Sequence, residues 1–308
     1  MTTVALGRAP DEAGQAALDR ALAALEREAP EPVERGRRAL AAALSWTTRT
    51  DWPEVAWQFS PLADGVPVEL VWRPGRPGLF WTAEPAAPEW SGARCLTRAL
   101  ALLRSIDGGL PCGTRSAARE ALAQVDEPWP VWAAGRHDAR GDAGKLYVLC
   151  RLAAPRVERA APLLRGDDKP MMLGLTRDGG REFYWARSTR VAGDLWRLCA
   201  DPEIEPLARS LDAALADWTG GGFDDEDGSR LGLSLALDAT GHVAALAAFM
   251  RVSAAGGEER VRKRLLDSGG DANPALATLW ADRQVRPMML TLGATSVGIA
   301  TAIGLRIV

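Results

Sequence analysis

The feature that most constrains the fold of this chain of 308 residues is an alternation of helical and two-stranded patterns. From residue 65 onward, five segments each contain two short apolar runs around a turn rich in glycine, proline or aspartate, which is the signal of a β-hairpin. One or two segments with helical spacing of apolar residues separate each hairpin from the next. The pattern predicts helices in residues 1–46 and hairpins near residues 66–85, 130–152, 170–188, 230–252 and 286–307.

Five hairpins supply ten antiparallel strands, and this number indicates the fold class. A sheet of about ten strands tends to curl or close, and closure removes its unpaired edges. Helices must then cover the apolar outer face. We therefore expect an α+β fold in a single domain over residues 1–308, with a ten-stranded antiparallel β-barrel inside a ring of helices and room for a ligand in the barrel. The alternative is two sheets in two domains, joined by residues 219–229.

Two segments of the chain nearly repeat, "KPMML" at residues 169–173 and "RPMML" at residues 286–290. They are predicted to be the first strands of the third and fifth hairpins. Proline suits the start of a strand, because its missing N–H then falls outside the ladder. We interpret the methionines as flexible apolar filler rather than as a metal site.

Composition excludes several classes of function. The net charge of −3 gives no reason to expect nucleic acid or a membrane surface as a partner. No apolar run reaches the roughly 18 residues that span a bilayer, and the N-terminus lacks a signal-peptide pattern. The four cysteines form no C-x-x-C pair, which fits reduced thiols and a cytoplasmic protein.

The sequence predicts no metal site. Its two histidines, His137 and His242, lie in or beside hairpin turns and are expected at the surface. The acidic segment 223–228 lies among glycines ahead of a strand, so we interpret it as a solvated loop. Magnesium is compatible with the chain but is not indicated by it.

The fivefold order of helix, strand, strand and helix resembles the ABBA or PT-barrel family of aromatic prenyltransferases, which includes the dimethylallyltryptophan synthases and the bacterial and cyanobactin-type enzymes. Three local matches support the resemblance. "VPVELVW" is similar to the first strand of the family and puts Glu69 in the position of the glutamate that accepts the indole N–H. "KLYVL" places Lys145 at a diphosphate-binding position and Tyr147 at a cation-shielding position, and "REFYWARS" places Tyr184 at the matching tyrosine.

The resemblance implies an enzyme that moves an allylic prenyl group from its diphosphate to an indole, a tryptophan-like group or another aromatic acceptor, either a small molecule or a peptide. Such activity belongs to secondary metabolism and the biosynthesis of natural products, and no cofactor is required if cationic side chains take the place of a metal. Cationic side chains would stabilise the departing diphosphate, and aromatic faces would shield the carbocation. A carboxylate, here Glu69, would orient the acceptor and act as general base.

The chain also departs from the family pattern. Phe80 stands where the family has an arginine, and Gly180 and Glu182 stand where it has an arginine and a lysine. Ala247 and Phe249 replace a polar residue and a tyrosine, and the fifth hairpin has no tyrosine. Either other cations bind the diphosphate, with Arg76, Arg187 and Arg251 as candidates, or the barrel holds something other than an isoprenoid diphosphate.

The candidates for an acceptor pocket are the aromatic residues of the predicted strands, namely Trp72, Trp81, Trp132 and Phe249, although strand alternation sends about half of any such set outward. Glu69 and Lys145 are each also compatible with the solvent-facing side of a half-buried strand. Two other functions stay open. One is a degenerate barrel that binds a small molecule without turning it over, and the other is a barrel enzyme with different chemistry on an apolar substrate.

Overall fold

The computed structural model describes residues 12–48, 67–87, 89–125, 130–150, 169–187, 201–220, 231–268 and 274–307. The acidic segment 223–228 and helices that the sequence predicts over residues 156–166 and 191–200 lie outside the described residues. The candidate linker 219–229 lies outside them from residue 221 onward.

The described residues form seven α-helices: α1 (Glu12–Glu26), α2 (Pro30–Ala43), α3 (Gly92–Asp107), α4 (Cys112–Leu122), α5 (Glu205–Thr219), α6 (Glu258–Ser268) and α7 (Pro274–Ala281). Short 3-10 helices follow α2 and β8: η1 (Leu44–Thr48) and η4 (Val252–Ala255). The ten strands are β1 (Val68–Trp72), β2 (Gly78–Ala83), β3 (Val131–Asp138), β4 (Gly141–Leu149), β5 (Lys169–Thr176), β6 (Arg181–Arg187), β7 (Leu231–Leu237), β8 (Val243–Arg251), β9 (Val285–Thr295) and β10 (Gly298–Ile307).

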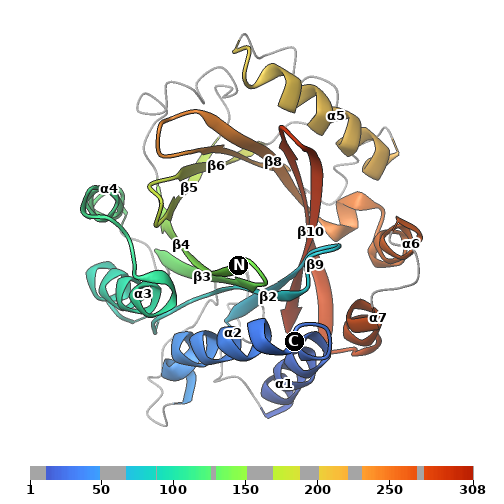
Figure 1. Cartoon of the computed structure of the whole chain (residues 1–308), viewed down its shortest axis with the longest axis horizontal. Coiled ribbons are helices and arrows are strands. Elements are labelled where there is room, and N and C mark those ends of the chain that lie inside the picture. Colours follow the sequence, from blue (N-terminus) through green and yellow to red (C-terminus); the bar gives the residue numbers. More distant parts are fainter. Residues whose placement is uncertain are drawn as a thin grey trace, which may run out of the picture.

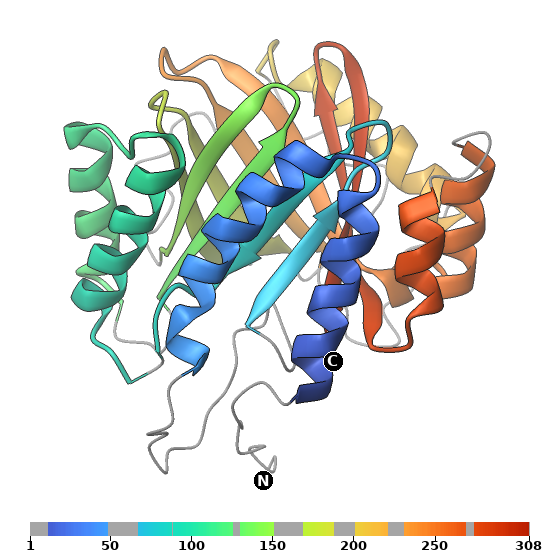
Figure 2. The same ribbon diagram turned by 60° about the horizontal axis from the view of Figure 1, so that its bottom comes forward.

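The ten strands close into one antiparallel barrel, as the sequence predicts. Each strand pairs with its neighbours in the sequence, and β1 pairs with β10 to close the ring. Figure 1 looks along the barrel and shows the strands as an inner ring with the helices outside it. The turns of the five hairpins lie at one end, which we call the turn end (Figure 2). Closure leaves none of the ten described strands with a free edge for pairing with another chain.

The helices cover the outer face of the barrel. Helix α2 packs on β2 and β3, α3 on β3 and β4, α4 on β4 and β5, and α5 on β8 and β9. Helix α3 shows how its sequence sets its ends: the Ser91 side chain accepts a hydrogen bond from Arg94 N–H, and Gly108 ends the helix with a φ of +91°. None of the described helices combines the length and the apolar character needed to cross a lipid bilayer.

Alternation along each strand separates an outer face from an inner face. In β1, for example, Val68, Leu70 and Trp72 are buried against the helix layer, whereas Glu69 and Val71 face inward and keep part of their surface exposed. The same alternation recurs in β4 and β8. We call the space bordered by the inward side chains the lumen.

The two near-repeated segments begin β5 and β9, as predicted, and they share a feature that the sequence interpretation missed. In each, the pairing register shifts so that the first methionine, Met171 or Met288, is an extra residue in a β-bulge. The second methionine, Met172 or Met289, then takes an inward position. Both copies of the motif therefore carry a β-bulge at the same residue.

Candidate functional site

Strand β1 directs Glu69 into the lumen, opposite Thr82 of β2 and Arg306 of β10. Its carboxylate extends over Gly304, where any side chain would overlap Glu69 Oε1. Within the described part of the chain no hydrogen bond or ion pair reaches this carboxylate, and burial raises the pKa of Glu69 to about 7. Glu69 is therefore about half ionised near neutral pH, which suits a group that accepts a proton.

Lys145 of β4 and Glu182 of β6 form an ion pair in the lumen. Lys145 Nζ also donates to the hydroxyl of Tyr184 at 3.0 Å, and the Ser234 hydroxyl of β7 donates to the other Glu182 oxygen at 2.5 Å. Burial opposes both charges, but their mutual attraction outweighs it, so the pKa of Lys145 is raised and the pKa of Glu182 is lowered. Both groups are therefore charged at neutral pH.

Three aromatic rings surround this ion pair and form what we call the aromatic cage: Tyr147, Tyr184 and Phe249. The ring centroids of Tyr147 and Tyr184 lie 5.7 Å apart, and those of Tyr184 and Phe249 lie 5.8 Å apart. Lys145 Nζ lies 4.9 Å from the Tyr147 centroid and 5.4 Å from the Tyr184 centroid. The ammonium therefore lies beside the Tyr147 ring and at the hydroxyl end of Tyr184.

Glycines on neighbouring strands make room for the side chains of the site. A Cβ at Gly174 of β5 would lie 2.6 Å from Lys145 Cε, and one at Gly232 of β7 would overlap the Phe249 ring. Gly304 of β10 leaves room for Glu69 in the same way. The side chains of Lys145, Phe249 and Glu69 therefore each lie over a glycine of a neighbouring strand. The sequence alone did not reveal this pairing, because it depends on the strand register.

A second group of cations, which we call the arginine group, comprises Arg73, Arg76 and Arg136. The guanidinium carbons of Arg73 and Arg76 lie 4.9 and 5.6 Å from the ring centroid of Phe80. Arg76 is paired with Asp138 at 2.5 Å. Within the described residues the buried Nε of Arg73 has no hydrogen-bond partner.

The arginine group faces the same part of the lumen as the Lys145–Glu182 pair. Burial and the nearby Arg76 lower the pKa of Arg73, and the charge of Glu182 acts in the opposite direction. Arginine keeps its proton despite such shifts. The lumen and its turn end therefore hold four cations, of which Lys145 and Arg73 lie near the aromatic cage, and an anion can find charge-assisted donors there.

The structure brings together several of the residues that the sequence singled out. These predicted residues border the lumen or its turn end: Glu69, Arg76, Trp132, Lys145, Tyr147, Tyr184 and Phe249. Trp132 lies at the end away from the turns, where it packs with Trp46 and Ala87. The functional role of each residue stays a prediction, but their placement in one space is observed.

Other predicted site residues lie elsewhere. Trp72 and Trp81 occupy outward positions of β1 and β2 and belong to the core beneath the helices, so they do not line the lumen. Arg187 is buried on the outward face of β6. Tyr184, three residues earlier on the same strand, faces inward, and side chains an odd number of residues apart on a strand point to opposite faces. Arg251 is the exposed last residue of β8, and no described interaction joins it to the cage.

His137 is a further correction, because it is buried rather than at the surface. It points outward from β3 towards α2, where a Cβ on Gly36 would lie 2.8 Å from its ring, and its Nδ1 lies 3.1 Å from Asp142 Oδ1. Burial lowers its pKa. His242, by contrast, is exposed as expected.

Sequence reasoning missed Arg73 and Arg136. Arg73 lies four residues after Glu69 and Arg136 lies four residues after Trp132, so alternation alone places both on inward faces. That signal was available once Glu69 was assigned to the lumen.

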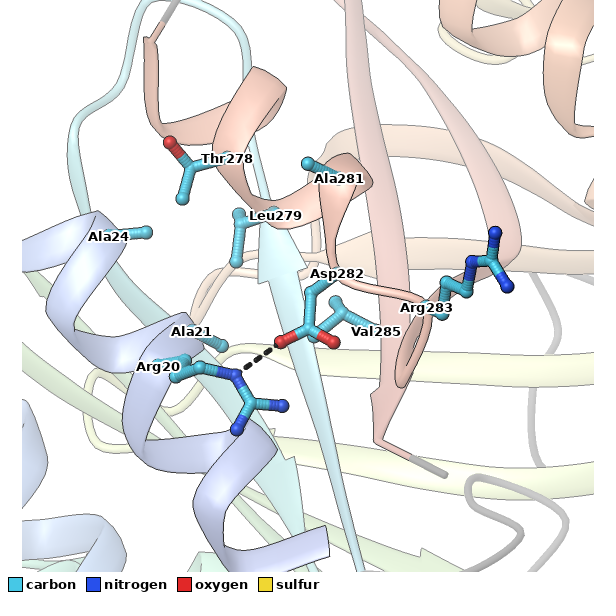
Figure 3. A pocket seen from close by; sticks show the side chains of 9 residues that line it. All are labelled: Arg20, Ala21, Ala24, Thr278, Leu279, Ala281, Asp282, Arg283 and Val285. Atoms are coloured by element: carbon cyan, nitrogen blue, oxygen red, sulfur yellow. Dashed lines mark hydrogen bonds and ion pairs between the residues drawn. The ribbon is translucent and has the colours of Figure 1, made fainter. Parts of the chain in front are cut away.

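One hollow lies outside the barrel, between α1 and the segment from α7 to β9, and has a volume of about 350 Å³ (Figure 3). Arg20 closes one side by donating to Asp282 and to Gln284, each at 2.7 Å. This hollow shares no residue with the lumen, and we interpret it as a packing seam between helices. Among the described residues, no three His, Cys, Asp or Glu side chains gather as a metal site would require.

The sequence matches no known protein-family model and no curated protein. Solved structures, however, share the fold. The chain is 15% identical to 5-dimethylallyl tryptophan synthase from Streptomyces coelicolor in complex with DMASPP and Trp, with a TM-score of 0.69 over 95% of this chain and 93% of that chain. It is 16% identical to PriB in its binary complex with product diphosphate, with a TM-score of 0.70 over 95% of each chain. It is 14% identical to AnaPT from Neosartorya fischeri, with a TM-score of 0.63 over 97% of this chain and 95% of that chain. The chain therefore has the PT-barrel fold of these prenyltransferases, as its sequence pattern predicts.

Proposed function

We propose that the protein is an aromatic prenyltransferase that moves an allylic prenyl group from its diphosphate to an aromatic acceptor of the indole or tryptophan type. The observation that carries the proposal is that the lumen and its turn end hold a carboxylate of raised pKa, an aromatic cage and four cations. The neighbouring structures support it, because the 5-dimethylallyl tryptophan synthase is in complex with DMASPP and Trp, and PriB is in complex with product diphosphate.

The arginine group and Lys145 would bind the diphosphate. When the bond between the allylic carbon and the bridging oxygen breaks, its electron pair leaves with the diphosphate, and negative charge develops there. Guanidinium and ammonium groups stabilise such charge best in a site shielded from water. Arg73 suits this role because its buried Nε has no hydrogen-bond partner among the described residues.

The aromatic cage would shield the allylic cation. The Tyr147 ring lies 4.9 Å from the ammonium of Lys145, and the faces of Tyr147 and Tyr184 would attract an allylic cation that entered the cage. Burial keeps Tyr184 protonated by raising its pKa, so its hydroxyl does not react as a phenolate. Phe249 closes the cage on the side of β8.

Glu69 would orient the acceptor and take the proton that the ring loses. A ring carbon of the acceptor forms the new bond to the allylic carbon. The proton on the same ring carbon must then leave to restore aromaticity. A carboxylate with a pKa of about 7 is half available as a base at neutral pH. Gly304 gives this carboxylate the space it needs.

The test is incubation of the protein with dimethylallyl or geranyl diphosphate and with tryptophan or indole acceptors, followed by mass spectrometry for the prenyl increment. We expect product with the wild-type chain and a loss of at least about a hundredfold in Lys145→Ala and Glu69→Gln, a typical effect of removing one stabilising or basic group. Arg209→Ala, on the exposed face of α5, is the matched control and should retain activity. Absence of product with every donor and acceptor would contradict the proposal.

The Lys145–Glu182 ion pair favours a second candidate, a barrel that binds a small molecule without turnover. Glu182 neutralises a cation that a diphosphate would otherwise use. This candidate predicts that calorimetry detects binding of an aromatic ligand while no prenylated product forms. Turnover in the first experiment would exclude it.

A further inference from the structure

The ammonium of Lys145 lies inside the aromatic cage, beside the Tyr147 ring and hydrogen-bonded to the Tyr184 hydroxyl, and takes up space that an allylic group would need. Its Nζ atom is 4.9 Å from the Tyr147 ring centroid and 5.4 Å from the Tyr184 ring centroid. The side chain reaches this position by crossing Gly174, where a Cβ would approach its Cε to 2.6 Å. A donor molecule and Lys145 in this position would therefore compete for the cage.

Glu182 is what keeps the ammonium there. It pairs with Lys145 Nζ, and its other carboxylate oxygen accepts from Ser234 at 2.5 Å. Tyr184 and Ser234 both help to lower the pKa of this carboxylate. Because Ser234 holds Glu182 from β7, we expect the carboxylate to stay in place if Lys145 moves towards the arginine group.

We propose that Glu182 is a positioning residue that holds Lys145 in the aromatic cage until the diphosphate of a donor draws Lys145 away, and that it then faces the allylic cation in place of the ammonium. This inference rests on the proposed function. Binding of a donor is thus an exchange of ion pairs: Lys145 leaves Glu182 for a phosphate oxygen, and no covalent bond changes. The vacated cage receives the allylic group.

The exchange has opposite effects on the two stages of the reaction. The pair with Glu182 must be broken before Lys145 can contact phosphate, so Glu182 weakens binding of the donor. Once Lys145 has left, the ionised carboxylate of Glu182 lies beside the cage, where it stabilises positive charge as it develops in the transition state. A residue that served only to hold the barrel together would not divide binding and chemistry in this way.

The first test compares wild type with Glu182→Gln, which keeps the shape of the side chain and its capacity to accept from Ser234 but removes the charge. We expect the dissociation constant for inorganic diphosphate, measured by calorimetry, to fall about tenfold, because one charge-assisted contact no longer competes. With a donor and an acceptor, KM for the donor should fall and kcat should fall as well. Glu205→Gln removes an exposed ion pair on α5 and is the matched control, with both parameters unchanged.

The second test needs no variant that alters the network. The chain has only three lysines, at positions 145, 169 and 263, so isotope-labelled lysine gives few NMR signals. In the free protein the terminal CH₂ group of Lys145 should be shifted by the ring currents of Tyr147 and Tyr184. Inorganic diphosphate should move that signal towards the position of an ordinary lysine.

The outcomes separate the inference from the proposed function. If the wild type binds diphosphate but the ring-shifted signal stays in place, or Glu182→Gln binds no tighter, the inference is wrong while the prenyltransferase proposal stands. If neither protein binds millimolar diphosphate and no donor reacts, both proposals are overturned.

Discussion

Glu69 should make the protein less stable as the pH rises, and replacing it should remove that effect. Its pKa is about 7 in the folded barrel and 4.5 as a free side chain, because burial disfavours the charged form. The folded state therefore binds more protons than the unfolded state between these two values. Stability is fully present below about pH 4.5 and is lost progressively as the pH rises through about 7.

The size of the effect follows from the shift. Each pKa unit corresponds to about 1.4 kcal/mol, so ionised Glu69 lowers the free energy of unfolding by about 3 kcal/mol above neutral pH. Glu69→Gln carries no charge and should be more stable than wild type by that amount at about pH 8.5, while the two proteins should be nearly equal at about pH 4.5. The same variant should lose prenyl transfer, so stability and activity would move in opposite directions.

The assay is urea unfolding of both proteins across this pH range, followed by tryptophan fluorescence. Comparing the two proteins at each pH cancels the contributions of other titrating groups. A difference in the free energy of unfolding that stays constant with pH, or a variant less stable than wild type at high pH, would refute the placement of Glu69 as an unpartnered carboxylate in the lumen.

Three further predictions use the same geometry. Gly304→Ala should displace the Glu69 carboxylate and lower kcat/KM at least about tenfold, whereas Gly293→Ala, whose new Cβ would meet nothing closer than 3.9 Å, should behave like wild type. Tyr184→Phe keeps the ring and should retain most of kcat, while Tyr184→Leu should lose it and release water-quenched prenyl alcohol, measured by gas chromatography. The wild-type kcat/KM should rise with pH to a plateau with a midpoint near 7, the pKa of Glu69, and a flat profile would contradict its role as base.

The barrel could be predicted from the sequence because the information for it is local. Each hairpin is written in a short segment, and five such segments leave few ways to bury their apolar faces. The side chains that face the lumen are harder to predict than the strands. An error of one residue in the position of a strand moves all its side chains to the opposite face. Trp72 shows this: it lies three residues after Glu69 and so faces the helices.

Contacts between strands far apart in the sequence could not be predicted in this way. Glu182 stood out only as a departure from a family pattern, and its pairing with Lys145 depends on the register of β4, β5 and β6. The burial of His137 depends on where α2 packs, which no feature near His137 encodes. Arg73 was predictable from alternation, but its buried and unpartnered Nε was not.

The two bulged strands place different side chains at equivalent positions of the barrel. After each bulge the second methionine lies opposite one inward position of the next strand, and that position holds Tyr184 in one hairpin and Gly304 in the other. The first copy fills its position with a phenol ring. The second leaves it empty, and the carboxylate of Glu69 crosses from the adjacent strand to fill it. A ring that attracts cations and a carboxylate that attracts protons are thus alternative occupants of equivalent positions, set at matching depths by the same five-residue segment.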